Sequence, residues 1–515
     1  MNITAFPNDI FLLIVANLSP TDLILCRRVS KQFQAAFSES DLNYHLLKSH
    51  YPRVRELRGA GLKETNWSEA FKRAASRYHH LKSGRPQSIE KFPLAKSLVV
   101  PSWARSYPVA PWQRHLQFEE KTAPFHYPDP LWTYDAGLLI FPNAKEQKYT
   151  VYDLSTGWMA GADIDPETKI VRRLRLKEKV LIVEWCEPVA FHQLNENELV
   201  HRHFATAYDI VRDRQHAPWR AVFRYVSSIP NRTQVEHIRN EWKIHFLGMP
   251  LNSRDRFFSV HTENHYAMYL WQPNRSVWGE DDPIESLAIW DISKHSSYHP
   301  SEDPTGKAKP SEDLEGPRVL RRFSFSDLGF YRLRQRSSPV LRGLELDENN
   351  VYFIQEDHRW IVGSQASHVH PRLHKVKTTG IPFSAAGPFW EDECGADGDV
   401  NLSFCERGSD MRAPNIAPCW RHEEFPYLTI TEAMDTEAGV TFSARHCFML
   451  ETISINVKPK VQMTGPGYEI SLRDDLYQQL LAKGTIRGDE RWLLGENTKD
   501  EVVILHFDRA VRDTI

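Results

Sequence analysis

The chain has 515 residues, of which 41% are hydrophobic and 25% are charged, and its formal net charge is −3. This composition is ordinary for a folded globular protein, and the length suffices for two or three domains. Neither sign of charge dominates, so we expect no general affinity for nucleic acid or for an anionic membrane. Six cysteines occur without a Cys-x-x-Cys pair. This pattern argues against a structural zinc site or a disulfide scaffold, and favours reduced thiols in the cytoplasm or the nucleus.

No targeting or membrane-spanning segment is expected. The stretch Met1 to Pro7 lacks the basic residues that precede the apolar part of a signal peptide. Nowhere do about 18 apolar residues run together, the length that a membrane-spanning helix needs.

Short helices are predicted over residues 6–47. Pro7 suits a helix start, because proline lacks an N–H group that would be unpaired there. Ser19, followed by Pro20, and Ser30 are start signals for two further helices, since a serine side chain can accept from a free backbone N–H. Apolar residues recur at helical spacing, which gives each helix an apolar face. A bundle this small is marginal alone, so leftover apolar residues on its outside suggest a partner.

The same segment resembles an F-box. Four pieces stand in the order of that family's motif: Phe6-Pro7, Asp9-Ile10, Pro20-Thr21-Asp22-Leu23 and Val29-Ser30-Lys31-Gln32-Phe33. One departure is Phe6, where leucine is commoner. An unrelated helical bundle is the alternative.

The resemblance implies two partners, the S-phase-kinase-associated adaptor protein and, through it, a cullin scaffold. It also implies a set of apolar contacts to the adaptor from Phe6, Pro7, Ile10, Ile14, Leu18, Pro20 and Leu23. The sequence does not separate the members of this set that face the partner from those that fill the module's own core. We take residues 1–50 as the F-box module.

Residues 51–92 are predicted to form a helical connector. Trp67, Ala70, Phe71 and Ala74 follow helical spacing, and the segment ends at Gly84 and Pro86. The neighbouring His79 and His80 would point to different sides of a helix, so we expect them in solvent and not on a metal. A stiff connector of this kind would hold the helical module in a fixed orientation.

From residue 93 to 515 the pattern changes to short β-branched and aromatic runs between turn residues. We therefore predict a multidomain chain, with the small all-α module and connector followed by a large all-β domain. At ~40–50 residues per repeat, a β-propeller of about six to eight blades would absorb this length and protect the strand edges. Two separate β-domains are the alternative.

An aromatic residue followed by Asp recurs at the ends of apolar runs. The pairs are Tyr152-Asp153, Tyr208-Asp209, Trp290-Asp291 and Phe507-Asp508. They resemble the Trp-Asp pair of the WD-repeat family, in which the aromatic ring lies between sheets. The companion Gly-His pair is missing and the intervals are irregular, so the resemblance is loose.

Residues 293–317 are predicted to be a disordered insertion, because they are rich in Pro, Ser and charge and poor in apolar residues. Ser301 and Ser311, each followed by acidic residues, are candidate phosphorylation sites, and a passive loop is the plainer interpretation.

No catalytic arrangement is recognised, and no catalytic residue, metal site or cofactor is predicted. Asp397 begins a stretch like a calcium loop, but Leu402 and Gly408 stand where Gly and Glu are needed. Cys394, Cys405 and Cys419, with His422, lack zinc-finger spacing. The run Tyr331 to Arg336 alternates basic and apolar residues; it would suit an acidic ligand, although a solvated strand face is the simpler interpretation.

These features predict a non-enzymatic substrate-recognition subunit of an SCF-type ubiquitin ligase in the cytoplasm, the nucleus or both. Its partners would be the adaptor, a cullin and an unknown protein substrate, with no nucleic acid and no membrane. An F-box scaffold outside the ligase is one alternative. A propeller enzyme or carbohydrate-binding protein is another.

Overall fold

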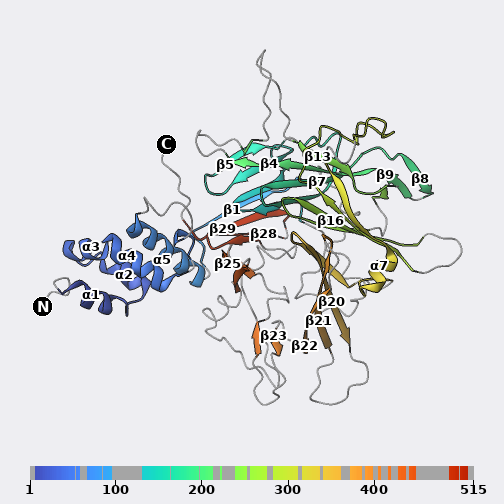
Figure 1. Ribbon diagram of the computed structural model, residues 1–515. Coiled ribbons are helices and arrows are strands. Elements are labelled where there is room, and N and C mark those ends of the chain that lie inside the picture. Colours follow the sequence, from blue (N-terminus) through green and yellow to red (C-terminus); the bar gives the residue numbers. More distant parts are fainter. Residues whose placement is uncertain are drawn as a thin grey trace, which may run out of the picture. The chain divides into compact units, whose positions relative to one another are not determined.

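In the computed structural model, helices come first along the chain and strands follow (Figure 1). The structure describes residues 6–52, 54–57, 66–83, 85–95, 130–162, 164–196, 198–212, 221–222, 238–246, 248–251, 256–274, 282–310, 316–336, 340–360, 372–384, 389–397, 404–406, 416–418, 427–435, 440–447, 487–497 and 499–508. Two units divide the chain. Unit 1 comprises Met1–Lys91, Phe425–Thr498 and Val502–Ile515, and unit 2 comprises Phe92–Glu424 and Lys499–Glu501.

Unit 1 begins with helices α1 (Asn8–Val15), α2 (Pro20–Cys26), α3 (Lys31–Phe37) and α4 (Ser40–His50). A short 3-10 helix, η2 (Arg55–Leu57), and the long helix α5 (Trp67–Ser83) follow. The predicted starts at Ser19 and Ser30 are confirmed. The side chain of Ser19 accepts from the backbone N–H of Asp22 at 3.2 Å, and that of Ser30 accepts from Phe33 at 3.2 Å.

One hydrophobic core joins these helices. Val15, Leu23 and Leu47 are buried in it together with Phe71 and Ala74 of α5. Helix α5 contacts both α2 and α4. Most of the segment predicted as a connector is therefore part of the same packed bundle as α1–α4.

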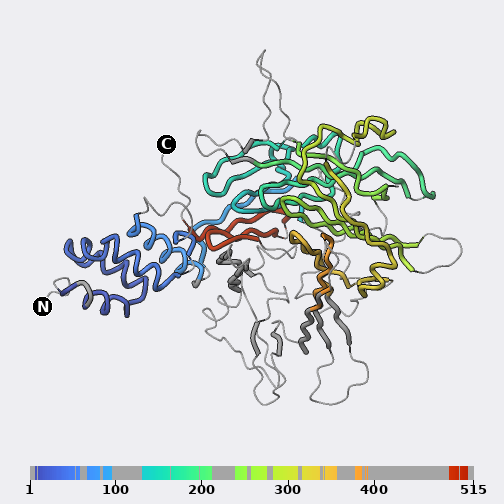
Figure 2. Tube along the Cα trace, viewed as in Figure 1, coloured from blue at the N-terminus to red at the C-terminus, as the bar shows by residue number. Residues whose placement is uncertain are grey.

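Unit 1 also contains a four-stranded sheet, in the order β1-β29-β28-β27. Its strands are β1 (Ser88–Pro93), β27 (Arg487–Asp489), β28 (Trp492–Glu496) and β29 (Glu501–His506). Figure 2 shows β1, in light blue, beside the red strands from the other end of the chain. Residues 88–92 were expected in the helical connector, but they form most of strand β1. They form a strand because they pair with β29, a partner that local sequence does not reveal. Strands β25 (Tyr427–Asp435) and β26 (Val440–Cys447) pair with each other.

Within its described residues, unit 2 contains four four-stranded sheets, and neighbouring strands in each are antiparallel. The first sheet has β2 (Thr133–Asp135), β3 (Leu138–Asn143), β4 (Lys148–Asp153) and β5 (Trp158–Gly161). The second has β6 (Ile170–Lys177), β7 (Val180–Cys186), β10 (His203–Asp209) and β13 (Ile238–Lys243). The third has β15 (Arg256–His261), β16 (His265–Gln272), β17 (Ile284–Asp291) and β18 (Arg318–Phe323). The fourth has β19 (Leu341–Leu346), β20 (Asn350–Trp360), β21 (Arg372–Pro382) and β22 (Trp390–Asp397).

Smaller elements interrupt or follow these sheets along the chain. Strands β8 (His192–Asn195), β9 (Glu198–His201) and β14 (Met249–Pro250) form a three-stranded sheet. Two strand pairs are β11 (Val211–Arg212) with β12 (Ala221–Val222), and β23 (Phe404–Glu406) with β24 (Ile416–Pro418). Helix α7 (Phe325–Phe330) follows β18.

Consecutive four-stranded sheets of unit 2 pack face to face. Ile140 of the first sheet and Val183 of the second share one core, and Ile182 and Met268 join the second sheet to the third in another. The neighbours Ile182 and Val183 thus point into different cores, as the two-residue period of a strand requires. A third core joins the third and fourth sheets through Ile289 and Phe353. The predicted large β-rich region is confirmed, while its closure into a propeller stays a prediction.

The aromatic–Asp pairs occupy equivalent places in their sheets. Asp153, Asp209 and Asp291 each end the third strand of a four-stranded sheet, namely β4, β10 and β17. Phe507-Asp508 directly follows β29, which is third when its sheet is counted from β27. The aromatic residues before these aspartates are buried. The pairs therefore mark a repeated position, although their spacing along the chain is irregular.

The insertion at 293–317 differs from the expected disordered loop over its described part. Residues 293–310 follow a series of turns, in which the N–H of Ser296 donates to the carbonyl of Arg239 at 2.9 Å. The N–H of Ser301 donates to the buried carboxylate of Glu241 at 3.1 Å. Polar partners on β13 therefore order a segment whose composition alone indicates disorder. Ser311 lies outside the described residues.

No helix in the described ranges is both long and apolar enough to span a membrane.

Candidate functional site

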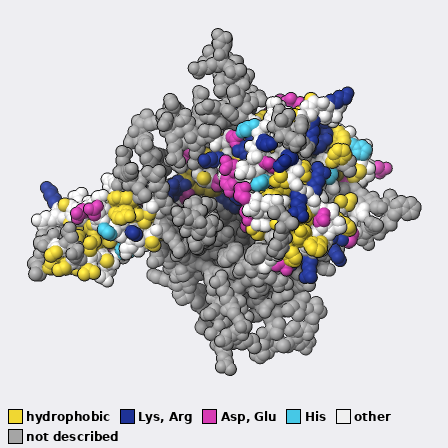
Figure 3. Space-filling view, in the orientation of Figure 1, with side chains coloured by type: hydrophobic (Ala, Val, Ile, Leu, Met, Phe, Trp, Pro, Cys, Tyr) yellow, Lys and Arg dark blue, Asp and Glu magenta, His cyan; other side chains and the backbone are white. Residues whose placement is uncertain are grey.

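The helical module carries apolar side chains that its own core does not cover. Four of them, on α1, α2 and the turn after α2, are between 46% and 70% exposed: Ile10, Leu13, Leu25 and Val29. Figure 3 shows hydrophobic side chains gathered on this module. We call these four residues the apolar face. A bundle that buries Phe11 and Val15 on one side of α1 while exposing Ile10 and Leu13 has two apolar sides, and the second is suited to a partner.

The structure divides the seven predicted contact residues into three groups. Pro7 and Ile10 are exposed, and Ile10 belongs to the apolar face. Four others are partly exposed: Phe6, Ile14, Leu18 and Pro20. Leu23 is only 1% exposed and packs in the module core. A direct partner contact from Leu23 is therefore not compatible with this fold, because the helical period reveals an apolar stripe but not which stripe faces inward.

Leu13, Leu25 and Val29 were missing from the predicted set. A sequence signal for Leu13 was present, since residues 10–15 read Ile-Phe-Leu-Leu-Ile-Val without interruption. Six apolar residues in a row cover every side of a helix, and a small bundle can bury only one side. Leu25 and Val29 lack such a signal, because their exposure depends on how α2 packs on α4 and α5.

A polar contact fixes α2 against its neighbours. The guanidinium of Arg27 donates to the side-chain oxygen of Asn43 at 2.7 Å and to the carbonyl of Ser68 at 3.3 Å. Asn43 is fully buried, and its amide donates to the carbonyls of Phe37 and Glu39 at 3.0 and 2.6 Å. Helix α2, which carries Leu25 of the apolar face, is thus held by hydrogen bonds as well as by apolar packing.

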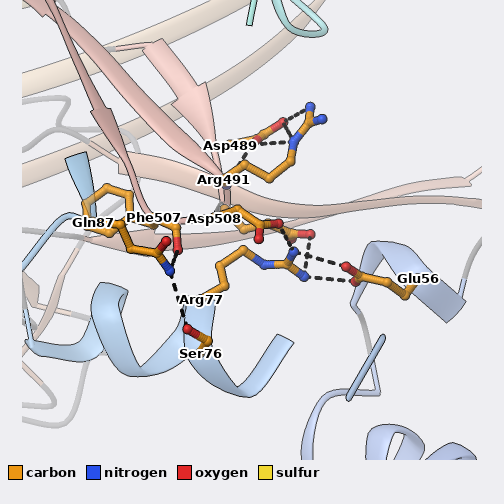
Figure 4. A network of polar contacts seen from close by, with 9 residues as sticks. Glu56, Ser76, Arg77, Gln87, Asp489, Arg491, Phe507 and Asp508 are labelled. Atoms are coloured by element: carbon orange, nitrogen blue, oxygen red, sulfur yellow. Dashed lines mark hydrogen bonds and ion pairs between the residues drawn. The ribbon is translucent and has the colours of Figure 1, made fainter. Parts of the chain in front are cut away.

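At the other end of the bundle, Arg77 of α5 is fully buried among carboxylates (Figure 4). The N–H groups of its two terminal nitrogens donate to the two carboxylate oxygens of Glu56, at 3.0 and 2.8 Å. One of these nitrogens also donates to the carboxylate of Asp508, at 2.7 Å. A third carboxylate, Glu490, lies 3.5 Å away. The bidentate geometry is the strong form of an arginine–carboxylate pair.

The carboxylates around Arg77 differ in their pKa values. Burial would raise the pKa of Glu56, but the hydrogen bonds and the charge of Arg77 outweigh it and lower that pKa. For Glu490, burial dominates and raises the pKa to about 7. The negative charges of Asp489 and Glu56 act in the same direction, and Arg77 opposes them. One of the three carboxylates is thus poised to bind a proton near neutral pH.

Two further contacts join α5 and its C-terminal extension to the residues around β29 (Figure 4). The side-chain amide of Gln87 donates to the carbonyl of Phe507 and to the hydroxyl of Ser76, each at 3.3 Å. The backbone N–H of Gln87 donates to the carbonyl of His506 at 2.7 Å. Together with Arg77 these contacts hold α5 on the sheet β1-β29-β28-β27.

Across the described parts of both units, no group of three or more His, Cys, Asp and Glu side chains is arranged to hold a metal ion. Asp397 is described, but the rest of the calcium-like stretch lies outside the described residues, as do Cys419 and His422.

Comparison with family models finds a match to the F-box domain over residues 3–45, which include α1, α2 and α3 and the first part of α4. No curated protein sequence matches the chain. The F-box resemblance predicted from the residues Phe6 to Phe33 is therefore confirmed. F-box domains generally bind the S-phase-kinase-associated adaptor protein and thereby a cullin, in ubiquitin ligases of the SCF type.

Proposed function

Because the chain carries an F-box domain at residues 3–45, we propose that it is the substrate-recognition subunit of an SCF-type ubiquitin ligase. The apolar face of the helical module docks the adaptor, and the β-rich unit 2 holds a protein substrate. The chain itself catalyses no reaction and binds no cofactor. Its contribution is proximity, since tethering a substrate near the transfer site raises its effective concentration there. It works in the cytoplasm, the nucleus or both.

The exposed apolar face carries this proposal. Ile10, Leu13, Leu25 and Val29 remain in water although the module is otherwise well packed. Burying apolar surface gains roughly 25 cal/mol per Å². An adaptor that covers the four side chains would therefore gain several kcal/mol, by an order-of-magnitude estimate from that coefficient. This surface lies within the segment that matches the F-box.

The contacts of Arg77 support a positional role for unit 1. Arg77 and Gln87 fasten the helical bundle to the sheet that contains β1 and β29. A ligase subunit needs such stiffness, because a loose joint between the docking module and the next element would dilute the gain in effective concentration.

We also propose that the four-stranded sheets are blades of a β-propeller with about six to eight blades. Three observations support it: strands follow one another in chain order, consecutive sheets share cores, and β1 completes a sheet with the C-terminal strands.

Replacing Glu90 in the middle of β1 by proline tests whether β1 completes the sheet of the C-terminal strands. The proline should speed hydrogen exchange at the β29 amides that pair with β1. Unchanged exchange at these amides would contradict the proposal that β1 and the C-terminal strands form one blade.

Co-purification with the adaptor tests the ligase proposal. We expect Leu13→Asp combined with Ile10→Asp to abolish binding, because two charges cannot enter an apolar interface unpaired. The matched control is Leu199→Asp, which places the same charge on an exposed leucine of β9 in unit 2. Normal adaptor binding by the double variant would refute the docking face. Adaptor binding without cullin would instead favour an F-box scaffold outside the ligase.

A further inference from the structure

Unit 2 carries a second exposed apolar group, built from aromatic side chains around helix α7. Phe325, Phe330 and Phe389 are between 38% and 74% exposed. The ring of Tyr331 lies 5.1 Å from that of Phe330 and 5.8 Å from that of Phe389, so the three rings form one continuous strip. Exposed aromatic rings in contact with one another are typical of surfaces that bind other molecules.

Arginines accompany these rings. Residues 318–336 carry six arginines and a single acidic residue, Asp327, which gives a net charge of +5 in a chain whose overall net charge is −3. The side chain of Asp327 is used locally, since it accepts from the N–H of Ser324 at the start of α7. Figure 3 shows Lys and Arg side chains beside hydrophobic ones over the part of unit 2 that contains α7.

The path of the chain after α7 brings one arginine onto a ring and leaves another exposed. Leu333 and Gln335 are buried, and the residue between them, Arg334, stacks its guanidinium 4.0 Å from the ring centroid of Phe325. Arg332 has a positive φ of 58°, which is uncommon for a residue with a side chain, and it is exposed directly after Tyr331.

Arg334 already contacts carboxylates of the protein itself at this surface. Its guanidinium donates to Asp282 at 3.0 Å, although the Asp282 side chain is more than half exposed. Glu285, which is buried, lies 3.9 Å from the same guanidinium. Carboxylate and aromatic contacts thus already occur together at this arginine.

We propose that this surface, made of Phe325, Phe330, Tyr331, Arg332, Arg334 and Phe389, binds an acidic polypeptide segment that carries an apolar side chain. The apolar side chain packs on the strip of rings, and a neighbouring carboxylate pairs with the exposed Arg332. Charge complementarity selects this occupant. The net charge of +5 over residues 318–336 lies beside exposed aromatic rings, and so short a basic segment suits a short acidic peptide better than the extended backbone of a nucleic acid. The proposal does not depend on the F-box module.

Fluorescence anisotropy with the full chain tests the proposal. The probe is a short labelled peptide of Glu and Asp with one Leu and one Trp. It should bind, and raising the salt concentration should weaken the binding. A peptide with Gln and Asn in place of the acids, and one with Ser in place of Leu and Trp, should each bind at least about tenfold more weakly. Equal binding of either altered peptide would overturn the proposal, as would preferential binding of an oligouridine.

Two variants locate the surface. Phe330→Ser and Arg332→Glu should each weaken binding about tenfold without a change in thermal stability, because both side chains are exposed. Matched controls are Phe246→Ser, another highly exposed phenylalanine of unit 2, and Lys145→Glu, an exposed residue between β3 and β4 of the first sheet. Both controls should bind like the unaltered chain. The Arg332→Glu protein should recover binding to a peptide in which one Glu is replaced by Lys. Weaker peptide binding by the controls, or unchanged binding by Phe330→Ser and Arg332→Glu, would contradict the placement of the binding surface around α7.

Discussion

The guanidinium of Arg77 lies 2.7 Å from the carboxylate of Asp508, a residue 431 positions later in the chain. Asp508 belongs to the last of the four aromatic–Asp pairs, directly after β29, and Arg77 belongs to the helix that precedes β1. The contact therefore ties the helical bundle to the sheet in which the two strands meet. The equivalent aspartates Asp209 and Asp291 also face arginines, namely Arg239 and Arg318, each on the fourth strand of its own sheet.

Replacing Arg77 by Met should destabilise unit 1 strongly. The substitution leaves Glu56, Glu490 and Asp508 without their shared cation, and removing one partner of a buried ion pair costs about 3–5 kcal/mol. We expect faster native-state hydrogen exchange in both α5 and β29. The matched control is Arg28→Met, because Arg28 is exposed on the same bundle. Unchanged exchange in α5 would show that the cluster does not hold the helix.

Glu490 should make the stability of unit 1 depend on pH. Burial raises its pKa to about 7, whereas the unfolded chain has a glutamate pKa of about 4.3. Between these values the folded state retains a proton that the unfolded state has lost, so the free energy of unfolding falls as pH rises. The total change is about 4 kcal/mol and is complete about one pH unit above the folded-state pKa, near pH 8.

The charged groups facing Glu490 include Arg77 from α5, Arg55 and Glu56 from η2, and the adjacent Asp489. Arg491 and Asp508 lie in the same cluster. Glu490→Gln cannot titrate, so urea unfolding at pH 5 and pH 8 should show a smaller pH difference for this variant than for the unaltered chain. The same pH difference in both proteins would assign the dependence to another group.

Local signals in the sequence predicted local structure well. Ser19 and Ser30 act within three residues of themselves, and the caps form as expected. The recurrent aromatic–Asp pairs also marked a repeated strand end, because burial between two sheets and a turn afterwards impose the same residue types each time.

Features that depend on distant partners were not predictable. The sequence around Arg77 does not indicate Asp508, and the residues of β1 look like the end of a helical connector until β29 is beside them. The side on which Leu23 faces depends on α4 and α5 in the same way. The composition of residues 293–310 indicates a disordered loop, because the sequence does not reveal their polar partners Arg239 and Glu241, which lie on the distant strand β13.

Leu23 and Leu13 should separate packing from docking. Leu23→Ala removes side-chain atoms from a core position that is 1% exposed, and such changes cost about 2–5 kcal/mol. Leu13→Ala, at a position that is 70% exposed, should leave stability nearly unchanged and weaken adaptor binding. Urea unfolding and adaptor titration of both variants check the two effects. Equal destabilisation by the two substitutions would contradict the division between core and face.

Asp209 and Asp291 occupy equivalent strand ends but should differ in their contribution to stability. Arg239, which is largely buried, donates its Nε to Asp209 at 2.8 Å, so Asp209→Ala leaves that guanidinium without its carboxylate. Asp291 lies 4.0 Å from Arg318, about half of whose side chain is exposed, and mainly accepts from the N–H and the hydroxyl of Ser293. We expect Asp209→Ala to cost about 2–3 kcal/mol and Asp291→Ala about 1 kcal/mol.

Thermal unfolding of the two alanine variants, each compared with its asparagine counterpart, checks this difference. Asparagine keeps an acceptor oxygen and removes the charge. Asp291→Asn should therefore retain most of the stability, because a turn hydrogen bond needs only the acceptor. Asp209→Asn should retain much less, since an enclosed guanidinium loses its counter-charge. High salt should change the stability losses of Asp209→Ala and Asp209→Asn little, because salt screens an enclosed ion pair poorly. Equal losses of stability at the two positions would mean that the repeated aspartate stabilises the protein through its turn hydrogen bonds and not through the arginine.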